Sequence, residues 1–364
     1  MLVPKLRFKN FKNSWNDYLL EEIIYLKNNK YNPSSNIYYK CIELEHIEQE
    51  TGNIISYCNS TEQKSIKSIF NKNDILFGKL RPYLKKYWFA NFDGVCSTEI
   101  WVINSNNKIA INKFTYYIIQ TSKFNSMCCI STGTKMPRAD WNYIKEYSFY
   151  LPSLEEQTKI ANFLSLIDRK IELQTQLVDN LKLYKKGLLK KVFSNNKEWK
   201  SAKLGNIFQY EQPNNYIVEN AEYNSNYTIP VLTANKGFIL GYTNETNTYN
   251  KGKCIIFDDF TMDFKYVDFP FKVKSSAIKI LTAKKEYNIN FMYQLLKTIT
   301  LEPISHQRHY ISIVQNIEVT IPNIEEQNRI ANLFSNLDKK IEFETKKLQD
   351  LKTYKKGLLQ KMFI

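Results

Sequence analysis

Four aspartates grouped near residue 260 have the type and spacing that could support metal-dependent chemistry: Asp258, Asp259, Asp263 and Asp268. Carboxylates that bind a metal beside a lysine are typical of metal-assisted cleavage, and Lys265 lies among them. The run IIFDDFTMDFKYVDF also alternates like two strands joined by a turn, in which the aspartates cap the turn or face solvent. In a third interpretation, a carboxylate accepts a hydrogen bond from a cytosine amine. We favour the structural interpretation and predict no metal site.

His306 and His309 are three residues apart, a spacing that zinc sites sometimes use. The sequence supplies no neighbouring cysteine to complete such a site. Histidine, glutamine and arginine grouped on a loop are better suited to base edges or phosphates. This segment and residues 131–138 both precede a strand that leads into a predicted helix, so we interpret them as corresponding recognition loops. Their predicted contact residues are Thr132, Thr134, Lys135, Arg138, His306, Gln307, Arg308, His309 and Tyr310.

Two further segments interleave cations with aromatic residues. Cations bind phosphates, and an aromatic ring can pack against a sugar or an extruded base. The alternative is a solvated strand edge whose charges discourage aggregation. The candidate DNA-binding residues of these segments are Lys79, Arg81, Tyr83, Lys85, Lys86, Lys265, Tyr266, Lys272 and Lys274.

Motifs for catalysis are missing from the sequence. Methyl transfer to an adenine amine needs an Asp/Asn-Pro-Pro-aromatic pocket and a glycine loop for its cofactor, and the run Asp268-Phe269-Pro270-Phe271 lacks the second proline. There is also no phosphate-binding loop of the type G-x-x-x-x-G-K-[ST]. The six cysteines show no paired metal spacing and are expected to be reduced thiols. We therefore predict a chain without a catalytic centre or cofactor of its own.

The overall charge favours a polyanionic partner. Lys and Arg number 51 against 36 Asp and Glu, which gives a formal net charge of +15. Each phosphate that such a protein neutralises releases a condensed counterion, so double-stranded DNA is the expected partner. No run approaches the roughly 18 apolar residues of a membrane span, and the first residues lack a signal core. A cytoplasmic protein without membrane association is expected.

An internal repeat organises the chain. Residues 151–194 and 321–364 are identical at 23 of 44 aligned positions, without a gap. In both copies a proline and two glutamates come first and lysines come last, the order that suits the dipole of one long helix. Apolar residues recur in steps of four and three, which indicates a coiled-coil seam. Its apolar members are Ile160, Leu164, Ile167, Ile171, Val178, Leu181, Leu188, Val192, Ile330, Phe334, Leu337, Ile341, Leu348, Leu351, Leu358 and Met362.

Polar residues interrupt the seam at matching places, Gln174 and Lys185 in the first copy and Glu344 and Lys355 in the second, which would help to fix register. The segments 1–150 and 195–320 are rich in aromatic and β-branched residues and diverge after related openings at Trp15 and Trp199. We predict an α+β fold with domains 1–150 and 195–320. The long helices 151–194 and 321–364 would pair as an antiparallel coiled coil with pseudo-twofold symmetry.

At this level of detail the chain resembles the specificity subunits of Type I restriction–modification systems. The resemblance is carried by LPSLEEQTKIANFLSLIDRKIE and IPNIEEQNRIANLFSNLDKKIE at the helix starts, and by LYKKGLLKKVF and TYKKGLLQKMF at their ends. The opening VPKLRFKNFKNSWNDYLL also fits, as do the phrases NDILFGKLRPYLKKYW and IIFDDFTMDFKYVDFPF within the two domains. The second domain is shorter than the first, and YISIVQNIEVTIP is only a loose counterpart of DWNYIKEYSFYLP.

The resemblance implies two target-recognition domains that read a bipartite, asymmetric DNA sequence. It also implies partners: two modification subunits holding S-adenosylmethionine, and restriction subunits that use ATP and Mg²⁺. Adenine N6 methylation would be the reaction of that complex. Two alternatives stay open on the residues alone: a DNA-modifying or DNA-cleaving enzyme acting by itself, and a coiled-coil adaptor without a nucleic-acid role.

Overall fold

The computed structural model describes residues 3–35, 37–130, 136–194, 198–220, 222–235, 237–303 and 308–364. The chain divides into two compact units, which are described separately. Unit 1 comprises Met1–Gln174 with Lys347–Ile364, and unit 2 comprises Thr175–Lys346. Each long helix therefore contributes one end to each unit. Within the described residues, no helix has the length and apolar character needed to span a membrane.

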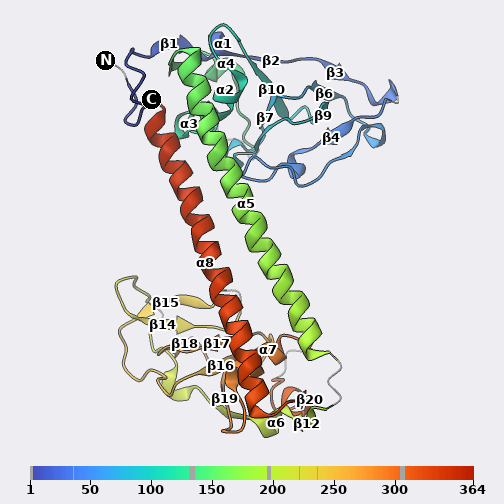
Figure 1. Cartoon of the computed structure of the whole chain (residues 1–364), viewed down its shortest axis with the longest axis vertical. Coiled ribbons are helices and arrows are strands. Elements are labelled where there is room, and N and C mark those ends of the chain that lie inside the picture. The colour runs from blue at the N-terminus through green and yellow to red at the C-terminus, as the bar shows by residue number, and fades with distance from the viewer. Residues whose placement is uncertain are drawn as a thin grey trace. The chain divides into compact units, whose positions relative to one another are not determined.

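Unit 1 is built around two sheets and a short strand pair (Figure 1). The central sheet is antiparallel, with the order β2 (Ile24–Leu26), β10 (Ile100–Ser105), β7 (Ile75–Gly78), β8 (Tyr87–Phe89). The second sheet has the order β3 (Lys30–Tyr31), β6 (Lys67–Phe70), β9 (Gly94–Cys96), β4 (Lys40–Ile42), β5 (Cys58–Asn59). The strand pair joins β1 (Asn16–Leu19) to β11 (Ser148–Leu151). The short helices are α1 (Leu20–Ile23), α2 (Asn112–Ile118), α3 (Ser122–Cys128) and α4 (Trp141–Ile144), with 3-10 turns at Pro33–Ser35, Leu44–His46, Ser60–Glu62 and Pro82–Leu84.

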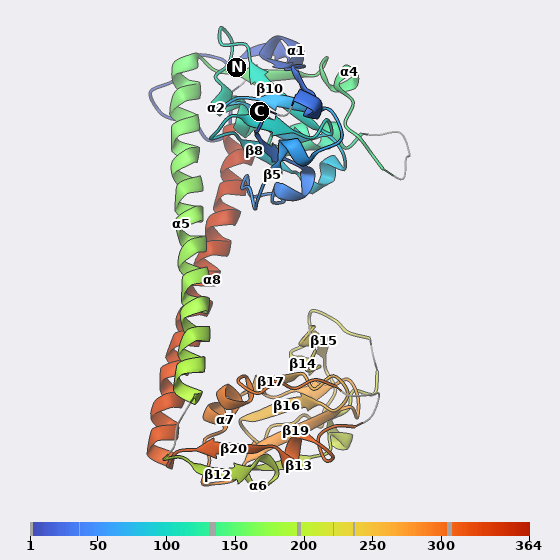
Figure 2. The same ribbon diagram turned by 90° about the vertical axis from the view of Figure 1, so that its right-hand side faces the viewer.

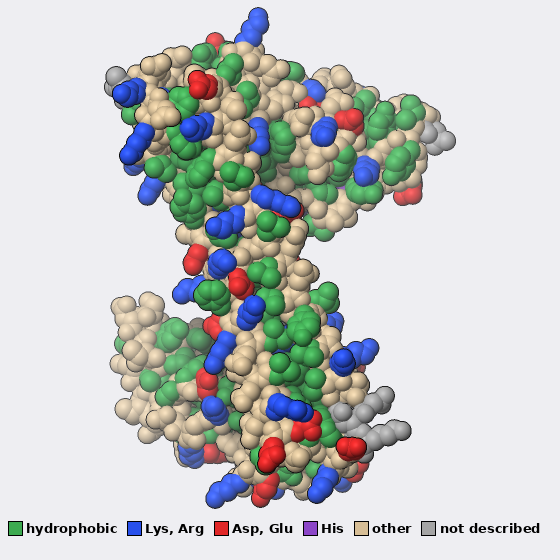
Figure 3. All heavy atoms as spheres, viewed as in Figure 1, with side chains coloured by type: hydrophobic (Ala, Val, Ile, Leu, Met, Phe, Trp, Pro, Cys, Tyr) green, Lys and Arg blue, Asp and Glu red, His purple; other side chains and the backbone are tan. Residues whose placement is uncertain are grey.

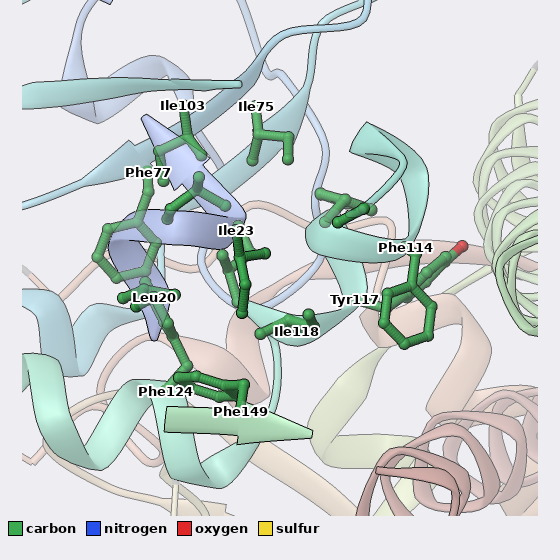
Figure 4. Packing of buried hydrophobic residues seen from close by; sticks show 14 of the residues in the cluster. Leu20, Ile23, Ile75, Phe77, Ile103, Phe114, Tyr117, Ile118, Phe124 and Phe149 are labelled. Atoms are coloured by element: carbon green, nitrogen blue, oxygen red, sulfur yellow. The ribbon is translucent and has the colours of Figure 1, made fainter. Parts of the chain in front are cut away.

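The core of unit 1 forms where the central sheet meets helices α1, α2 and α3 (Figure 4). Phe77 of β7 lies on the Trp101 ring with centroids 6.0 Å apart and meets Phe124 of α3 edge-on at 5.3 Å. The same cluster includes Leu164 from the beginning of one long helix and Leu358 from the end of the other. The helix ends are therefore part of the domain core.

Unit 2 repeats this plan. Its central antiparallel sheet has the order β13 (Phe208–Glu211), β19 (Ile278–Ala283), β16 (Cys254–Asp258), β17 (Phe264–Val267). Its second sheet has only three strands, in the order β15 (Ile239–Thr243), β14 (Ile229–Leu232), β18 (Lys272–Val273). The strand pair joins β12 (Lys200–Lys203) to β20 (Glu318–Ile321). The short helices are α6 (Leu204–Ile207) and α7 (Ile289–Leu296), with 3-10 turns at Asn214–Tyr216 and Val314–Asn316.

The two domains thus share a fold. The strand orders of the two central sheets match one to one, and each second sheet contains one parallel pair, β4 with β9 and β14 with β18. The loosely matching segments YISIVQNIEVTIP and DWNYIKEYSFYLP occupy equivalent places, because each forms a helical turn followed by the strand that pairs with the domain's opening strand. The second sheet, with three strands instead of five, is where the shorter domain differs.

The duplicated segments form the long helices α5 (Leu154–Phe193) and α8 (Ile324–Met362). Every predicted seam residue is buried or half-buried, whereas Leu166 is 69% and Leu333 47% exposed on other faces. In unit 1 the end of α8 lies beside the beginning of α5, and in unit 2 the end of α5 lies beside the beginning of α8 (Figure 2). The predicted antiparallel pairing is therefore confirmed within each unit.

The lysines that interrupt the seam form equivalent ion pairs. In unit 1, Lys355 Nζ lies 2.6 Å from a carboxylate oxygen of Asp168. In unit 2, Lys185 pairs with Asp338, and both members are related to those of unit 1 by the internal repeat. Because an unpaired, half-buried ammonium group is unfavourable, each pair favours this helix register over its neighbours.

A repeated glutamine anchors each helix to its domain. Gln157 is fully buried, accepts a hydrogen bond from the Ile111 N–H at 3.1 Å, and donates to the Ile109 and Pro152 carbonyls at 2.8 and 2.9 Å. Its counterpart Gln327 accepts from the Asn288 N–H at 2.9 Å and donates to the Pro322 carbonyl at 3.0 Å. Ile111 and Asn288 are the N-caps of α2 and α7, so the same side chain fixes the same helix in both domains.

Candidate nucleic-acid interface

In unit 1 the basic–aromatic segment forms the loop between β7 and β8. The Arg81 N–H donates to the Pro137 carbonyl at 2.8 Å, and the Lys79 carbonyl accepts from the Ala139 N–H at 2.8 Å. Leu80 pairs with Arg138 as an isolated bridge. The loop is therefore held against the described end of the first predicted recognition loop, so these two predicted segments form one surface.

The backbone of this loop turns sharply at two cations. Arg81 and Lys85 both have positive φ values, +52° and +48°, and the 3-10 turn Pro82–Leu84 lies between them. Left-handed backbone is uncommon for residues with a Cβ atom, and persists where the surroundings hold it. The turn leaves Arg81 exposed and Tyr83 52% exposed. These two side chains are available to a ligand.

The other cations of this surface already have partners. Arg138 pairs with Glu99 at 3.0 Å, Lys85 pairs with Glu50 at 2.7 Å, and the Lys86 ammonium donates to the Leu44 carbonyl at 2.6 Å. Exposed ion pairs of the first two kinds contribute about 0–1 kcal/mol, so a phosphate can replace the carboxylate at little cost. Lys79 is half-buried. Thr132, Thr134 and Lys135 lie outside the described residues.

The equivalent loop of unit 2, between β16 and β17, contains the aspartates. Asp258 Oδ1 accepts from the N–H groups of Phe260 and Thr261 at 2.9 and 3.0 Å, which closes the turn. Asp259 is buried, and its carboxylate accepts from the Tyr310 N–H at 2.8 Å and lies 3.4 Å from Lys279 Nζ. The strand–turn–strand interpretation is confirmed. In the described part of the chain, no group of three His, Cys, Asp or Glu side chains could hold a metal ion.

Three predicted contact residues of unit 2 are buried, which contradicts a direct contact with DNA. His309 is 1% exposed and its Nδ1 lies 3.0 Å from the Asp259 carbonyl. Tyr310 is 1% exposed, with its ring between Tyr210 and Phe257. The prediction failed for these two residues because their N–H groups bond to Asp259, which turns them inward against the β16–β17 turn.

Lys272 needs the same correction for a different reason. It lies on β18, and its ammonium group pairs with Glu245 at 2.8 Å and donates to the Thr246 carbonyl at 3.0 Å. Its side chain is 4% exposed. Lys272 therefore stabilises the second sheet of unit 2 and is not available to a phosphate.

The remaining candidates of unit 2 lie on its surface. Lys274 and Arg308 are exposed, and Lys265 and Tyr266 are half-buried on β17. The Tyr266 ring lies 5.6 Å from the Tyr293 ring of α7, and burial raises the pKa of Tyr266 to about 12. His306 and Gln307 lie outside the described residues. Lys297, which the sequence did not single out, places its Nζ 3.9 Å from the Tyr293 ring centroid.

Basic side chains are distributed along the visible face and alternate with hydrophobic ones (Figure 3). The matching strand orders and the paired loops define a class: a duplicated protein in which one fold presents two different loop surfaces. The family model described as "Type I restriction modification DNA specificity domain" matches residues 12–183 and again residues 196–353. The chain belongs to this family.

Individual relatives agree with this assignment. The chain is 46% identical over 126 residues to the Type I restriction enzyme EcoR124I/EcoR124II specificity subunit of Escherichia coli, an alignment that covers 33% of this chain and 31% of that protein. It is 23% identical over 350 residues to the MjaVIII specificity subunit of Methanocaldococcus jannaschii, covering 80% and 78%. The crystal structure of a Type I restriction–modification S subunit from M. genitalium has a similar fold, with a TM-score of 0.66 at 18% identity over 100% of this chain and 99% of that one.

Proposed function

We propose that this chain is the DNA-specificity subunit of a Type I restriction–modification complex and recognises a bipartite, asymmetric sequence. The observation that carries the proposal is the double match to a DNA specificity domain on two units of the same fold. The loop after β7 exposes Arg81 and Tyr83, whereas the loop after β16 exposes Phe260 and Asp263. Different side chains on one framework would read different half-sites.

In this proposal the chain contributes only the free energy of DNA binding to the function of the complex. Phosphate contacts would set its position on the duplex, and each good bidentate contact to a base edge would discriminate by roughly 1–3 kcal/mol. The chemistry would belong to partner subunits, with S-adenosylmethionine in the modification subunit and ATP and Mg²⁺ in the restriction subunit. Extrusion of the target adenine for the modification subunit would cost a few kcal/mol more.

The outer faces of the long helices support two copies of one partner. Leu173 of α5 and its repeat counterpart Phe343 of α8 are 50% and 65% exposed. Tyr184 and its counterpart Tyr354 are 61% and 52% exposed. Exposed apolar residues that recur at equivalent positions offer equivalent docking surfaces, as two modification subunits would require.

Methylation mapping tests the proposed function. In a host that carries this chain with its modification partner, we expect N6-methylated adenines in one two-part sequence with unlike halves, because each unit reads its own half-site. Omitting the chain should remove this methylation. Methylation or cleavage by the purified chain alone would instead establish an independent enzyme. Salt-insensitive, weak binding to duplex DNA would support the adaptor alternative.

Removing one heptad from each long helix, residues 174–180 and 344–350, should alter the spacer and leave the half-sites unchanged. The deletions keep the seam in phase and shorten each helix by about 10.5 Å. If helix length sets the spacing, the spacer should shorten by about three base pairs at about 3.4 Å each, or methylation should be lost. A change of bases within either half-site would contradict this division of roles.

A further inference from the structure

Two lysines lie near one carboxylate in unit 2. Lys185 of α5 forms the ion pair with Asp338 of α8. Lys297 comes just after α7, and the charges of Lys185 and Asp338 both act on it. Figure 2 shows α7 beside the end of α5. We call Lys185 and Lys297 the lysine cluster.

The lysine cluster holds more positive charge than its surroundings neutralise. The charge of Asp338 acts on Lys297, but this carboxylate already pairs with Lys185. Although part of the Lys297 side chain is exposed, its ammonium group lies over the Tyr293 ring. Burial there, followed by the charge of Lys185, lowers the pKa of Lys297 to about 8. Like charges brought together in this way raise the free energy of the unliganded protein.

The internal repeat shows what the helix pairing itself requires. At the equivalent place in unit 1, Lys355 pairs with Asp168 and donates to Gln120 Oε1 at 2.8 Å. Gln120 is nine residues after the N-cap of α2, as Lys297 is nine residues after the N-cap of α7. A neutral side chain therefore serves at this position in the other copy of the same fold.

Lys297 is therefore not needed to hold the two helices of unit 2 together. Its charge is thus left for an external anion.

We propose that the lysine cluster binds a phosphodiester group of duplex DNA beside the second recognition domain, with Lys297 as its central ligand. This inference rests on the proposed function and adds a specific backbone contact to it. A phosphate would neutralise the charge that Asp338 leaves uncompensated, and partly desolvated ammonium groups bind anions more strongly than solvated ones. Contacts to phosphate fix position and carry no base information, so the cluster would set the register of unit 2 on its half-site.

The proposal has a pH signature with a defined sign. Below about pH 8 Lys297 is protonated, and a bound phosphate favours that protonated form. As the pH rises through 8 the free protein loses this charge, so affinity for DNA should fall between pH 7 and pH 9. The charged groups that act on Lys297 are Lys185 of α5, Asp338 of α8 and, last, Lys265 of β17, and the Tyr293 ring of α7 lies 3.9 Å from its Nζ.

The test measures binding of the full-length chain, with its modification partner, to a labelled duplex pool of random sequence by fluorescence anisotropy. Lys297→Gln installs the side chain that unit 1 uses, and Lys297→Arg keeps a charge that does not titrate. Lys200→Gln on β12 is the matched control, because it removes an equal charge from an exposed position of unit 2. We expect Lys297→Gln to reduce the slope of log affinity against log salt by about 0.9 and to flatten the pH profile.

Lys297→Arg should keep the slope and lose the decline between pH 7 and pH 9. If Lys297→Gln and Lys200→Gln have the same slope and the same pH profile, the inference is wrong even though the wild type binds DNA. If the wild type itself does not bind duplex, the proposed function fails. Stabilisation of the wild type but not Lys297→Gln by inorganic phosphate, with unchanged duplex slopes, would assign the site to a free anion and overturn the proposal.

Discussion

Phe334→Ala should destabilise unit 2 by about 3–5 kcal/mol, the range for removing a buried phenylalanine. Phe334 is fully buried near the beginning of α8, and its ring stacks on Phe193 at the end of α5 with centroids 6.4 Å apart. Phe291 of α7 also meets the Phe193 ring at 5.4 Å. The substitution therefore opens a cavity where both long helices and the domain come together.

Hydrogen exchange by mass spectrometry measures this effect locally, since amides report the free energy of the opening that exposes them. Protection should fall in β16, β19 and α7 of unit 2, and much less in β7 and β10 of unit 1. Leu333→Ala is the control, because Leu333 is 47% exposed and such a change costs within about 0.5 kcal/mol. Equal loss of protection in both units, or an equal effect of Leu333→Ala, would contradict the assignment of Phe334 to the core of unit 2.

The long helices could be predicted because their signals are local and duplicated. The proline, the paired glutamates and the seam period lie within one segment, and the second copy repeats them. The ion pairs Lys185–Asp338 and Lys355–Asp168 explain why the polar residues that interrupt the seam occur at matching places. The aspartate partners themselves were not predicted, because they lie on the opposite helix, about 150 to 190 residues away in sequence.

The sequence predicts that both domains contain β-sheets, but it does not predict the order in which their strands pair. Many strands have only two to four residues, and the central sheet pairs β2 with β10 across about 75 residues of chain. Such short strands carry little pattern, and nothing local specifies a partner so distant in sequence. The parallel pair β4–β9 is a further feature that alternation of residue types does not indicate.

For the candidate interface, the sequence predicted where the loops lie but not which of their side chains are exposed. Arg81 and Arg138 share a surface, as the charge pattern suggests. His309 and Tyr310 turn inward because Asp259, distant in sequence, accepts their backbone N–H groups. Lys297 was not predicted because the sequences of the two domains diverge in this region. Its equivalence to Gln120 becomes clear only when residues are counted from the N-caps of α2 and α7, the helices that the buried glutamines anchor.

Gln157→Leu should destabilise unit 1 by at least about 3 kcal/mol. Leucine matches the size of glutamine but leaves the Ile111 N–H and the Ile109 and Pro152 carbonyls without the partner that now satisfies them. Each unsatisfied buried group costs about 1–3 kcal/mol. The loss frees the N-terminus of α2, so hydrogen exchange should accelerate first in that helix.

The internal repeat provides a second glutamine whose replacement should destabilise the protein less. Gln327→Leu removes hydrogen bonds to the Asn288 N–H and the Pro322 carbonyl, so its cost should be smaller and should appear in unit 2. Gln360→Leu, on an exposed face of α8, should change stability by no more than about 0.5 kcal/mol. Denaturant unfolding followed with hydrogen exchange would rank the three variants. If Gln157→Leu cost no more than Gln360→Leu, the buried glutamine would be a passive filler, and the attachment of α5 to its domain would have to come from apolar packing alone.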